Sequence, residues 1–72
     1  MTPNEAFDNY LNRFDLSVQH LKTKDLRILL QKPYWTISDW RRGRVKIDIA
    51  WQAKISEVLG EDIFADCETS NK

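Results

Sequence analysis

The sequence has little of what builds metal centres or disulfide bonds. It contains one cysteine, Cys67, and one histidine, His20, in 72 residues. A lone cysteine cannot form an internal disulfide, and a histidine without a second histidine or a cysteine nearby lacks the spacing of a metal site. We therefore expect neither a disulfide nor a metal, and no cofactor of any kind.

Long hydrophobic runs and catalytic motifs are also missing. No apolar stretch approaches the roughly 20 residues that span a bilayer, and the N-terminus lacks the basic and apolar regions of a secretory signal. Neither a glycine-rich phosphate loop, an activated serine or cysteine, nor a pair of carboxylates at catalytic spacing is present. The sequence therefore predicts a cytoplasmic, non-enzymatic protein without a membrane partner or a small-molecule substrate.

Glycine and proline are scarce, with two of each, and neither an alternating strand pattern nor a hairpin turn occurs. A chain of this length holds one domain with one core. We expect an all-α domain of four to five helices over residues 1–65, followed by a disordered polar tail over residues 66–72, in which Cys67 is an incidental thiol.

The first half of the chain predicts one clear helix and one less clear one. Thr2, Pro3 and Glu5 form an N-cap signal for a helix over residues 3–14. Its apolar face is Phe7, Tyr10, Leu11 and Phe14. Residues 15–22 predict a short helical turn. Thr23 then predicts the N-cap of a second helix that runs to Gln31 with Leu26, Leu29 and Leu30 facing inward.

The second half predicts two further helices. Pro33 favours a turn followed by a helix to Arg42, with Ile37 and Trp40 inward and Gly43 as its C-cap. Asp48 predicts the N-cap of a last helix that ends at Gly60. Its inward residues are Trp51, Ile55, Val58 and Leu59. Beyond it, Ile63 and Phe64 are expected to fold back on the core.

The chain also lacks net charge, since eleven lysines and arginines balance eleven acidic residues. Proteins that bind duplex DNA usually carry a basic excess or a basic stripe. Here only a local basic stripe is present, and its side chains are candidates for contacts with DNA phosphates. It consists of Arg41, Arg42, Arg44 and Lys46.

Two segments carry a family resemblance. Residues 36–44, TISDWRRGR, resemble the end of the recognition helix in lambda-repressor-like and Cro-like helix-turn-helix domains, and residues 54–60, KISEVLG, resemble the helix that closes their core. The resemblance implies a helix-turn-helix fold over about residues 23–64. The chain departs from the family pattern at Arg27, where a small residue is usual, and at Gln31, where the turn usually has glycine.

The whole chain resembles the modulators of repression, small antirepressors of lactococcal temperate phages. This resemblance implies a protein partner, the phage lysogeny repressor, engaged through its N-terminal DNA-binding domain. It also implies a function as a transcription regulator of the lytic-lysogenic switch that prevents the repressor from binding its operator.

The residues of the second helix of the motif favour protein contact over base reading. Aromatic residues and arginine dominate protein interfaces, whereas the acidic Asp39 would repel phosphates. Only Ser38 is a conventional base-reading residue among the outward positions. We expect the partner-binding residues to be Tyr34, Trp35, Ser38, Asp39, Arg41 and Arg42.

Two alternatives stay open. A Cro-like operator binder, acting alone or jointly with the phage repressor, would use the basic stripe for phosphates and Ser38 for bases. A homodimer would bury the aromatic patch against itself. Trp40 and Trp51 are expected in the core, whereas Trp35 is either exposed or packed under the last helix.

Overall fold

The structure is a computed structural model, and it describes residues 1–65 and residue 67. Four helices follow one another along the chain, and no strand occurs in the described residues. They are α1 (Pro3–Asn12), α2 (Leu16–Leu30), α3 (Tyr34–Arg42) and α4 (Ile49–Leu59). The all-α class and the number of helices are confirmed.

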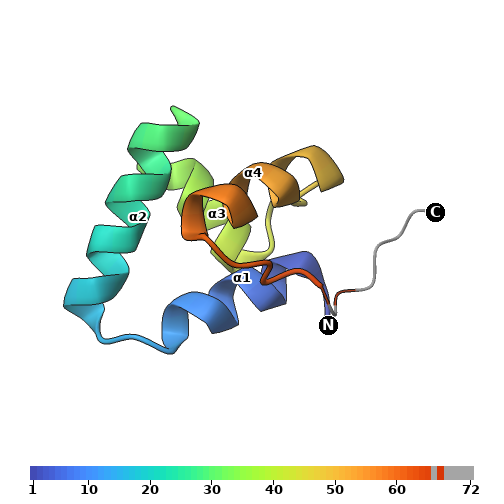
Figure 1. Cartoon of the computed structure of the whole chain (residues 1–72), viewed down its shortest axis with the longest axis horizontal. Helices are drawn as coiled ribbons and strands as arrows, with labels where there is room; N and C mark the ends of the chain where they lie inside the picture. The colour runs from blue at the N-terminus through green and yellow to red at the C-terminus, as the bar shows by residue number, and fades with distance from the viewer. Residues whose placement is uncertain (66, 68–72) are drawn as a thin grey trace.

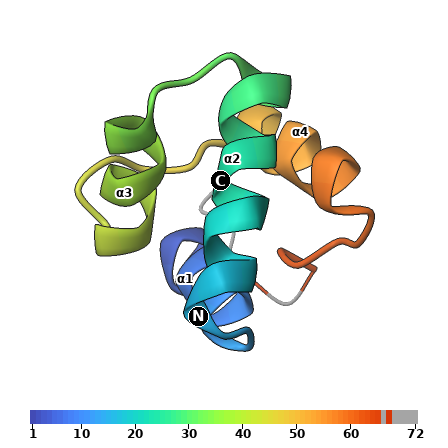
Figure 2. The same ribbon diagram turned by 90° about the vertical axis from the view of Figure 1, so that its left-hand side faces the viewer.

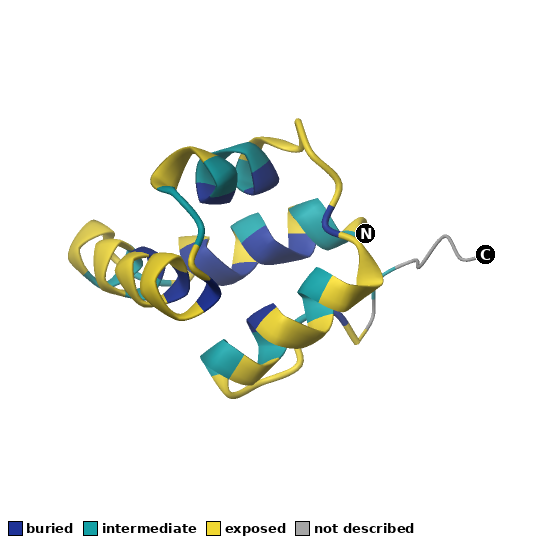
Figure 3. Cartoon of the chain, turned by 90° about the horizontal axis from the view of Figure 1, so that it is seen from above, coloured by how far each residue is buried: buried dark blue, intermediate teal, exposed yellow. Residues whose placement is uncertain are grey.

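The helices surround one core. In Figure 1, α1 lies along the bottom of the molecule, α2 stands at one side, and α3 and α4 lie above α1. Seen from that side, α2 passes in front of α1, with α3 and α4 to its left and right (Figure 2). Burial divides each helix lengthwise, so that buried residues face the centre of the molecule and exposed residues face outward (Figure 3).

α1 begins as the sequence predicts. The Glu5 backbone N–H donates to Thr2 Oγ1 and the Thr2 N–H donates to Glu5 Oε1, which together form a capping box. The helix ends at Asn12 rather than at residue 14, because Arg13 already closes it. Phe14 lies beyond the helix but still packs, partly buried, against the core.

α2 corrects two expectations. Asp15, not Thr23, caps this helix by accepting from the Val18 N–H at 3.0 Å. Thr23 lies in the middle of α2 and is buried, so residues 15–31 form one helix and its caps rather than a turn and a short helix. The hydrogen bonds from Val18 and Ser17 hold the pKa of the Asp15 carboxyl below its ordinary value.

The inward face of α2 is narrower than predicted. Leu26 and Leu30 are buried, but Leu29 is 63% exposed, because the buried side of α2 runs through Thr23, Leu26 and Leu30 and Leu29 lies about 100° around the helix from Leu30. The helix ends at Gln31, which adopts a left-handed conformation with φ 56°. The turn predicted between Gln31 and Pro33 is confirmed.

α3 and α4 begin and end close to the predicted positions. Pro33 is the N-cap of α3 and Gly43, with φ 76°, is its C-cap. Asp48 caps α4 by accepting from the Trp51 N–H at 3.0 Å, and Gly60 ends that helix. Gly43 and Gly60 are both in the left-handed conformation, which glycine adopts without a steric penalty.

The core joins all four helices. Its largest fully buried side chains are Phe7, Leu11, Leu26, Ile37 and Ile55. Trp40 packs edge-on against Phe7, with ring centroids 6.0 Å apart, and lies 5.7 Å from Trp51. The prediction that Ile63 and Phe64 return to the core is confirmed, since Phe64 is buried and Ile63 packs against it partly buried.

Cys67 differs from expectation because its side chain is half-buried against the core rather than exposed in a polar tail. The rest of the tail expected over residues 66–72 lies outside the described residues. Within the part of the chain that is described, no helix has the length and hydrophobicity needed to cross a membrane.

Candidate functional site

The outer face of α3 carries two large exposed aromatic side chains. Trp35 is 69% exposed and Tyr34 is 58% exposed, whereas Ile37 and Trp40 on the opposite face are buried. Asp39 and Arg42 follow Trp35 at spacings of four and seven residues, which places all three on one side of the helix. The structure therefore brings Trp35, Asp39 and Arg42 together on a face that points away from the core.

This arrangement decides between the two positions open for Trp35, because a side chain that is two-thirds exposed does not pack under α4. Trp40, at 2% exposure, belongs to the core as expected. Trp51 is half-buried beside the core, with the ammonium groups of Lys32 and Lys54 at 4.6 Å and 4.7 Å from its ring centroid. Such cation-aromatic contacts stabilise a ring that is only partly covered.

Tyr34 and Ser38 lie along a groove between α2 and α3. The groove has a volume of about 380 Å³. Leu16, 69% exposed, and His20 line its other wall from α2. The hollow thus combines apolar side chains with a hydroxyl, an imidazole and the charged groups of Asp8, Arg41 and Arg42.

Arg41 does not join the exposed cluster. Its Nε donates to Asp8 Oδ1 at 2.6 Å, its Nη2 to Asn12 Oδ1 at 2.8 Å and its Nη1 to Gln19 Oε1 at 3.1 Å. Asp8 and Asn12 belong to α1, while Gln19 belongs to α2. The guanidinium group therefore ties three helices together, and we call these four residues the Arg41 clasp.

Asn4 of α1 makes a second contact with the end of α3. The side-chain amide of Asn4 donates to the carbonyl oxygen of Trp40 at 2.9 Å and to that of Val45 at 2.7 Å. Asn4 and Asp8 are four residues apart and so lie on the same face of α1. Together they fix the position of the last turn of α3 and of the loop that follows it.

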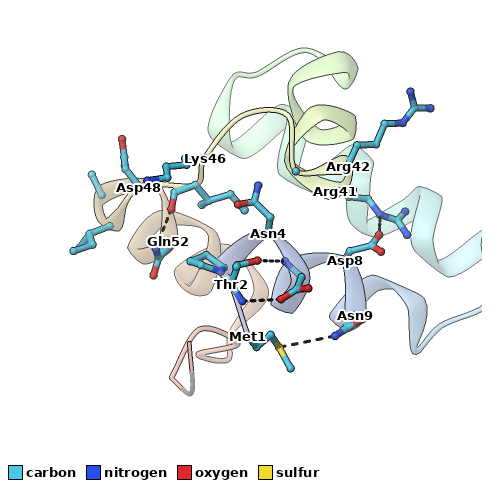
Figure 4. A pocket seen from close by; sticks show the side chains of 16 residues that line it. Met1, Thr2, Asn4, Asp8, Asn9, Arg41, Arg42, Lys46, Asp48 and Gln52 are labelled. Carbon is cyan, nitrogen blue, oxygen red and sulfur yellow. Dashed lines mark hydrogen bonds and ion pairs between the residues drawn. The ribbon is translucent and has the colours of Figure 1, made fainter. Parts of the chain in front are cut away.

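The basic stripe is divided by these contacts. Arg42, Arg44 and Lys46 are exposed and make no ion pair within the described residues, where the ion pairs are Arg41 with Asp8 and Arg13 with Glu61. In Figure 4 the Arg41 side chain turns toward Asp8, while that of Arg42 extends away from it. Three cations of the predicted four are therefore free to meet a ligand.

A larger groove runs past this region, between the start of α1 and the segment that joins α3 to α4 (Figure 4). Its volume is about 1260 Å³. Lys46, Asp48 and Gln52 line one side, and Thr2, Asn4 and Asp8 line the other. Opposite charges are mixed along its walls, so the groove does not select a ligand of one sign.

Sequence reasoning missed the partners of Arg41 and the exposed apolar face of α2. Asp8, Asn12 and Gln19 lie 33, 29 and 22 positions from Arg41, and no spacing rule connects residues so far apart. Four large apolar side chains of α2 are at least 60% exposed. They are Leu16, which lines the groove between α2 and α3, and Leu21, Ile28 and Leu29.

Comparison of the chain with protein-family models, with curated proteins and with solved structures found no match.

Proposed function

We propose that this chain is a helix-turn-helix regulator of the lambda-repressor-like type that acts as a phage antirepressor. In this proposal α2 and α3 form the helix-turn-helix pair, with α3 in the position of the recognition helix. The protein binds the N-terminal DNA-binding domain of the phage lysogeny repressor in the cytoplasm of the bacterial host. By covering that domain's operator-reading surface, it shifts the switch from lysogeny to lysis without any chemical step.

The short connection between α2 and α3 supports the helix-turn-helix assignment. Only residues 31–33 separate the two helices, and helix-turn-helix units use turns of three to four residues. Gln31 takes the left-handed conformation that glycine takes at low steric cost. Gln31 therefore allows the same backbone turn as the glycine that the family usually has at this position.

The exposure of Trp35 carries the functional part of the proposal. An indole ring that is 69% exposed beside a 58% exposed Tyr34 is unfavourable for a free protein in water and favourable at an interface. Tryptophan, tyrosine and arginine are enriched among the residues that dominate binding energy. Asp39 adds a negative charge that complements the basic surface of a DNA-binding domain and opposes contact with phosphates.

The partner face, defined as Tyr34, Trp35, Ser38, Asp39 and Arg42, is held by a rigid base. Ile37 and Trp40 anchor α3 in the core, and Arg41 fastens it to α1 and α2. We assign Arg41 to the interface through this positioning role. A helix that is fixed before binding loses less conformational freedom when the complex forms.

A gel-shift competition tests the proposal. The repressor's DNA-binding domain is bound to its operator and titrated with the wild-type chain, with Trp35→Ala, and with Leu21→Ala as a matched control of similar exposure on α2. We expect the wild type and Leu21→Ala to release free DNA and Trp35→Ala to be at least tenfold weaker, since loss of a central aromatic anchor commonly costs about 2 kcal/mol or more. Equal activity of all three proteins would contradict the assignment of the partner face.

The exposure of Arg42, Arg44 and Lys46 favours one second candidate, a Cro-like operator binder that acts alone or together with the repressor. The same gels separate these functions. A shifted band with this chain alone indicates an operator binder, and a slower band only in the presence of both proteins indicates joint binding. A homodimer through Tyr34 and Trp35 would instead appear as a concentration-dependent increase in mass.

A further inference from the structure

The Arg41 clasp lies where the two grooves of the molecule meet. Asp8 and Arg41 line both the groove between α2 and α3 and the larger groove beside α1. Their side chains keep 34% and 25% of their surface exposed. A ligand that enters either groove along the last turn of α3 therefore meets this ion pair beside the exposed Arg42, which also lines both grooves.

Arg41 differs from the other arginines of the stripe in its hydrogen bonds. Nε and both terminal nitrogens of Arg41 donate to oxygens of the protein, whereas Arg42, one residue later, is exposed and extends outward (Figure 4). The three acceptors are a carboxylate and two amides, so Asp8 alone neutralises the charge of Arg41. It also presents a partly exposed negative charge to anything that approaches.

We infer that Asp8 determines the class of partner that α3 accepts: by pairing with Arg41 it withholds this cation from nucleic-acid phosphates and weakens their binding at the end of the helix, and it keeps the face available for protein. This inference deepens the proposed function, and the part of it that concerns a protein partner rests on that function. The physical reason is local. Phosphate binding requires uncompensated positive charge at the contact, and the clasp removes one of four cations while adding an acid beside the others.

Substitution Asp8→Asn tests the inference, because asparagine keeps an oxygen that accepts from Arg41 but carries no charge. Glu61→Gln is the matched control, since it neutralises the acid of the Arg13 ion pair, which lines neither groove. Each protein is titrated into a short fluorescein-labelled DNA duplex of arbitrary sequence, and anisotropy is measured from about 50 to about 200 mM salt.

We expect Asp8→Asn to bind the duplex about fivefold more tightly than the wild type at the lowest salt, with a salt dependence steeper by about one ion. Glu61→Gln should match the wild type. The double variant Asp8→Asn/Arg41→Gln should lose the gain, because the released charge is then absent. Equal behaviour of Asp8→Asn and Glu61→Gln, or a gain that persists in the double variant, would overturn the inference.

A measurement on the unmodified protein decides the matter if Asp8→Asn does not fold, which circular dichroism will show. In a two-dimensional ¹H–¹⁵N spectrum the Nε–H signal of Arg41 should keep its position when the same duplex is added, while backbone signals around Arg42 shift. Displacement of the Arg41 signal together with those of Arg42 would overturn the inference. No repressor is present in these titrations, so failure of the wild type to release operator DNA rejects the proposed function separately.

Discussion

At the scale of single residues, the three tryptophans occupy three different environments. Trp35 is 69% exposed, Trp40 is 2% exposed, and Trp51 is half-buried beneath Lys32, from the turn between α2 and α3, and Lys54 of its own helix. Residue type alone does not distinguish them, because tryptophan is common both in cores and at interfaces. What separates them is the side of the helix on which each lies.

This difference predicts opposite effects on stability. Trp40→Ala should lower the free energy of unfolding by about 3–5 kcal/mol through the cavity that it leaves, whereas Trp35→Ala should change it by less than about 0.5 kcal/mol, as is usual for exposed positions. Urea denaturation followed by circular dichroism measures both. A large loss of stability in Trp35→Ala would mean that this ring belongs to the core and that the partner face is misassigned.

Arg41 shows why part of the site could not be predicted. The sequence places it in a run of cations, and a run of cations suggests a solvated or phosphate-binding surface. The acceptors that surround Arg41 come from α1 and α2, and they become neighbours only after the helices pack. The sequence therefore indicates which side chains are candidates but not which of them are already engaged within the fold.

At the scale of helices, local signals located most boundaries correctly. Thr2, Asp48, Gly43 and Gly60 each act as the sequence predicts, because a cap depends on residues within one turn of it. α2 was misread for a related reason. Its true cap, Asp15, is followed by the exposed Leu16 and Leu21, which blur the apolar periodicity, while Thr23 resembles a cap although the backbone around it is helical.

The C-cap of α2 makes a prediction at this scale. Gln31 is exposed and left-handed, a conformation that costs a side-chain-bearing residue about 1–2 kcal/mol. Gln31→Gly should therefore stabilise the protein by about 0.5–1 kcal/mol after the greater flexibility of glycine in the unfolded chain is deducted. The melting temperature should rise by a few degrees, since 1 kcal/mol corresponds to about 4–8 °C in a domain of this size.

Gly43→Ala, at the left-handed C-cap of α3, is the reciprocal control for this prediction. Apart from Gly43 itself and its two neighbours in the chain, no residue has an atom within 4 Å of the position a Cβ would take at Gly43, so the change introduces backbone strain at φ 76° and no collision. Calorimetry should show a lower melting temperature for Gly43→Ala. A lower value for Gln31→Gly as well would indicate that the Gln31 side chain makes a stabilising contact of its own.

At the scale of the whole molecule, the core closes only when the segment after α4 returns to it. Phe64 is 5% exposed and packs with residues of all four helices in one cluster. A domain of this size is stable by only about 4–11 kcal/mol. The segment that follows the last helix is therefore an essential part of the fold.

Phe64→Ala tests this role. Removing a buried phenylalanine ring costs about 3–5 kcal/mol, which is a large share of the stability available, so a sizeable unfolded population is expected at 37 °C. Ala65→Ser, at the exposed neighbouring position, should behave as the wild type. Unchanged urea midpoints for both variants would show that the core is complete without the segment after Gly60.

The two contacts that α1 makes with the end of α3, through Asn4 and through Asp8, imply that binding specificity can be adjusted from a distance. Directed evolution of this protein toward a new partner need not be confined to the contacting helix. Libraries that vary α1 at these two positions would re-aim α3 by small rotations while leaving its chemistry intact, so a change of specificity could arise from substitutions that no docking calculation would place in the interface.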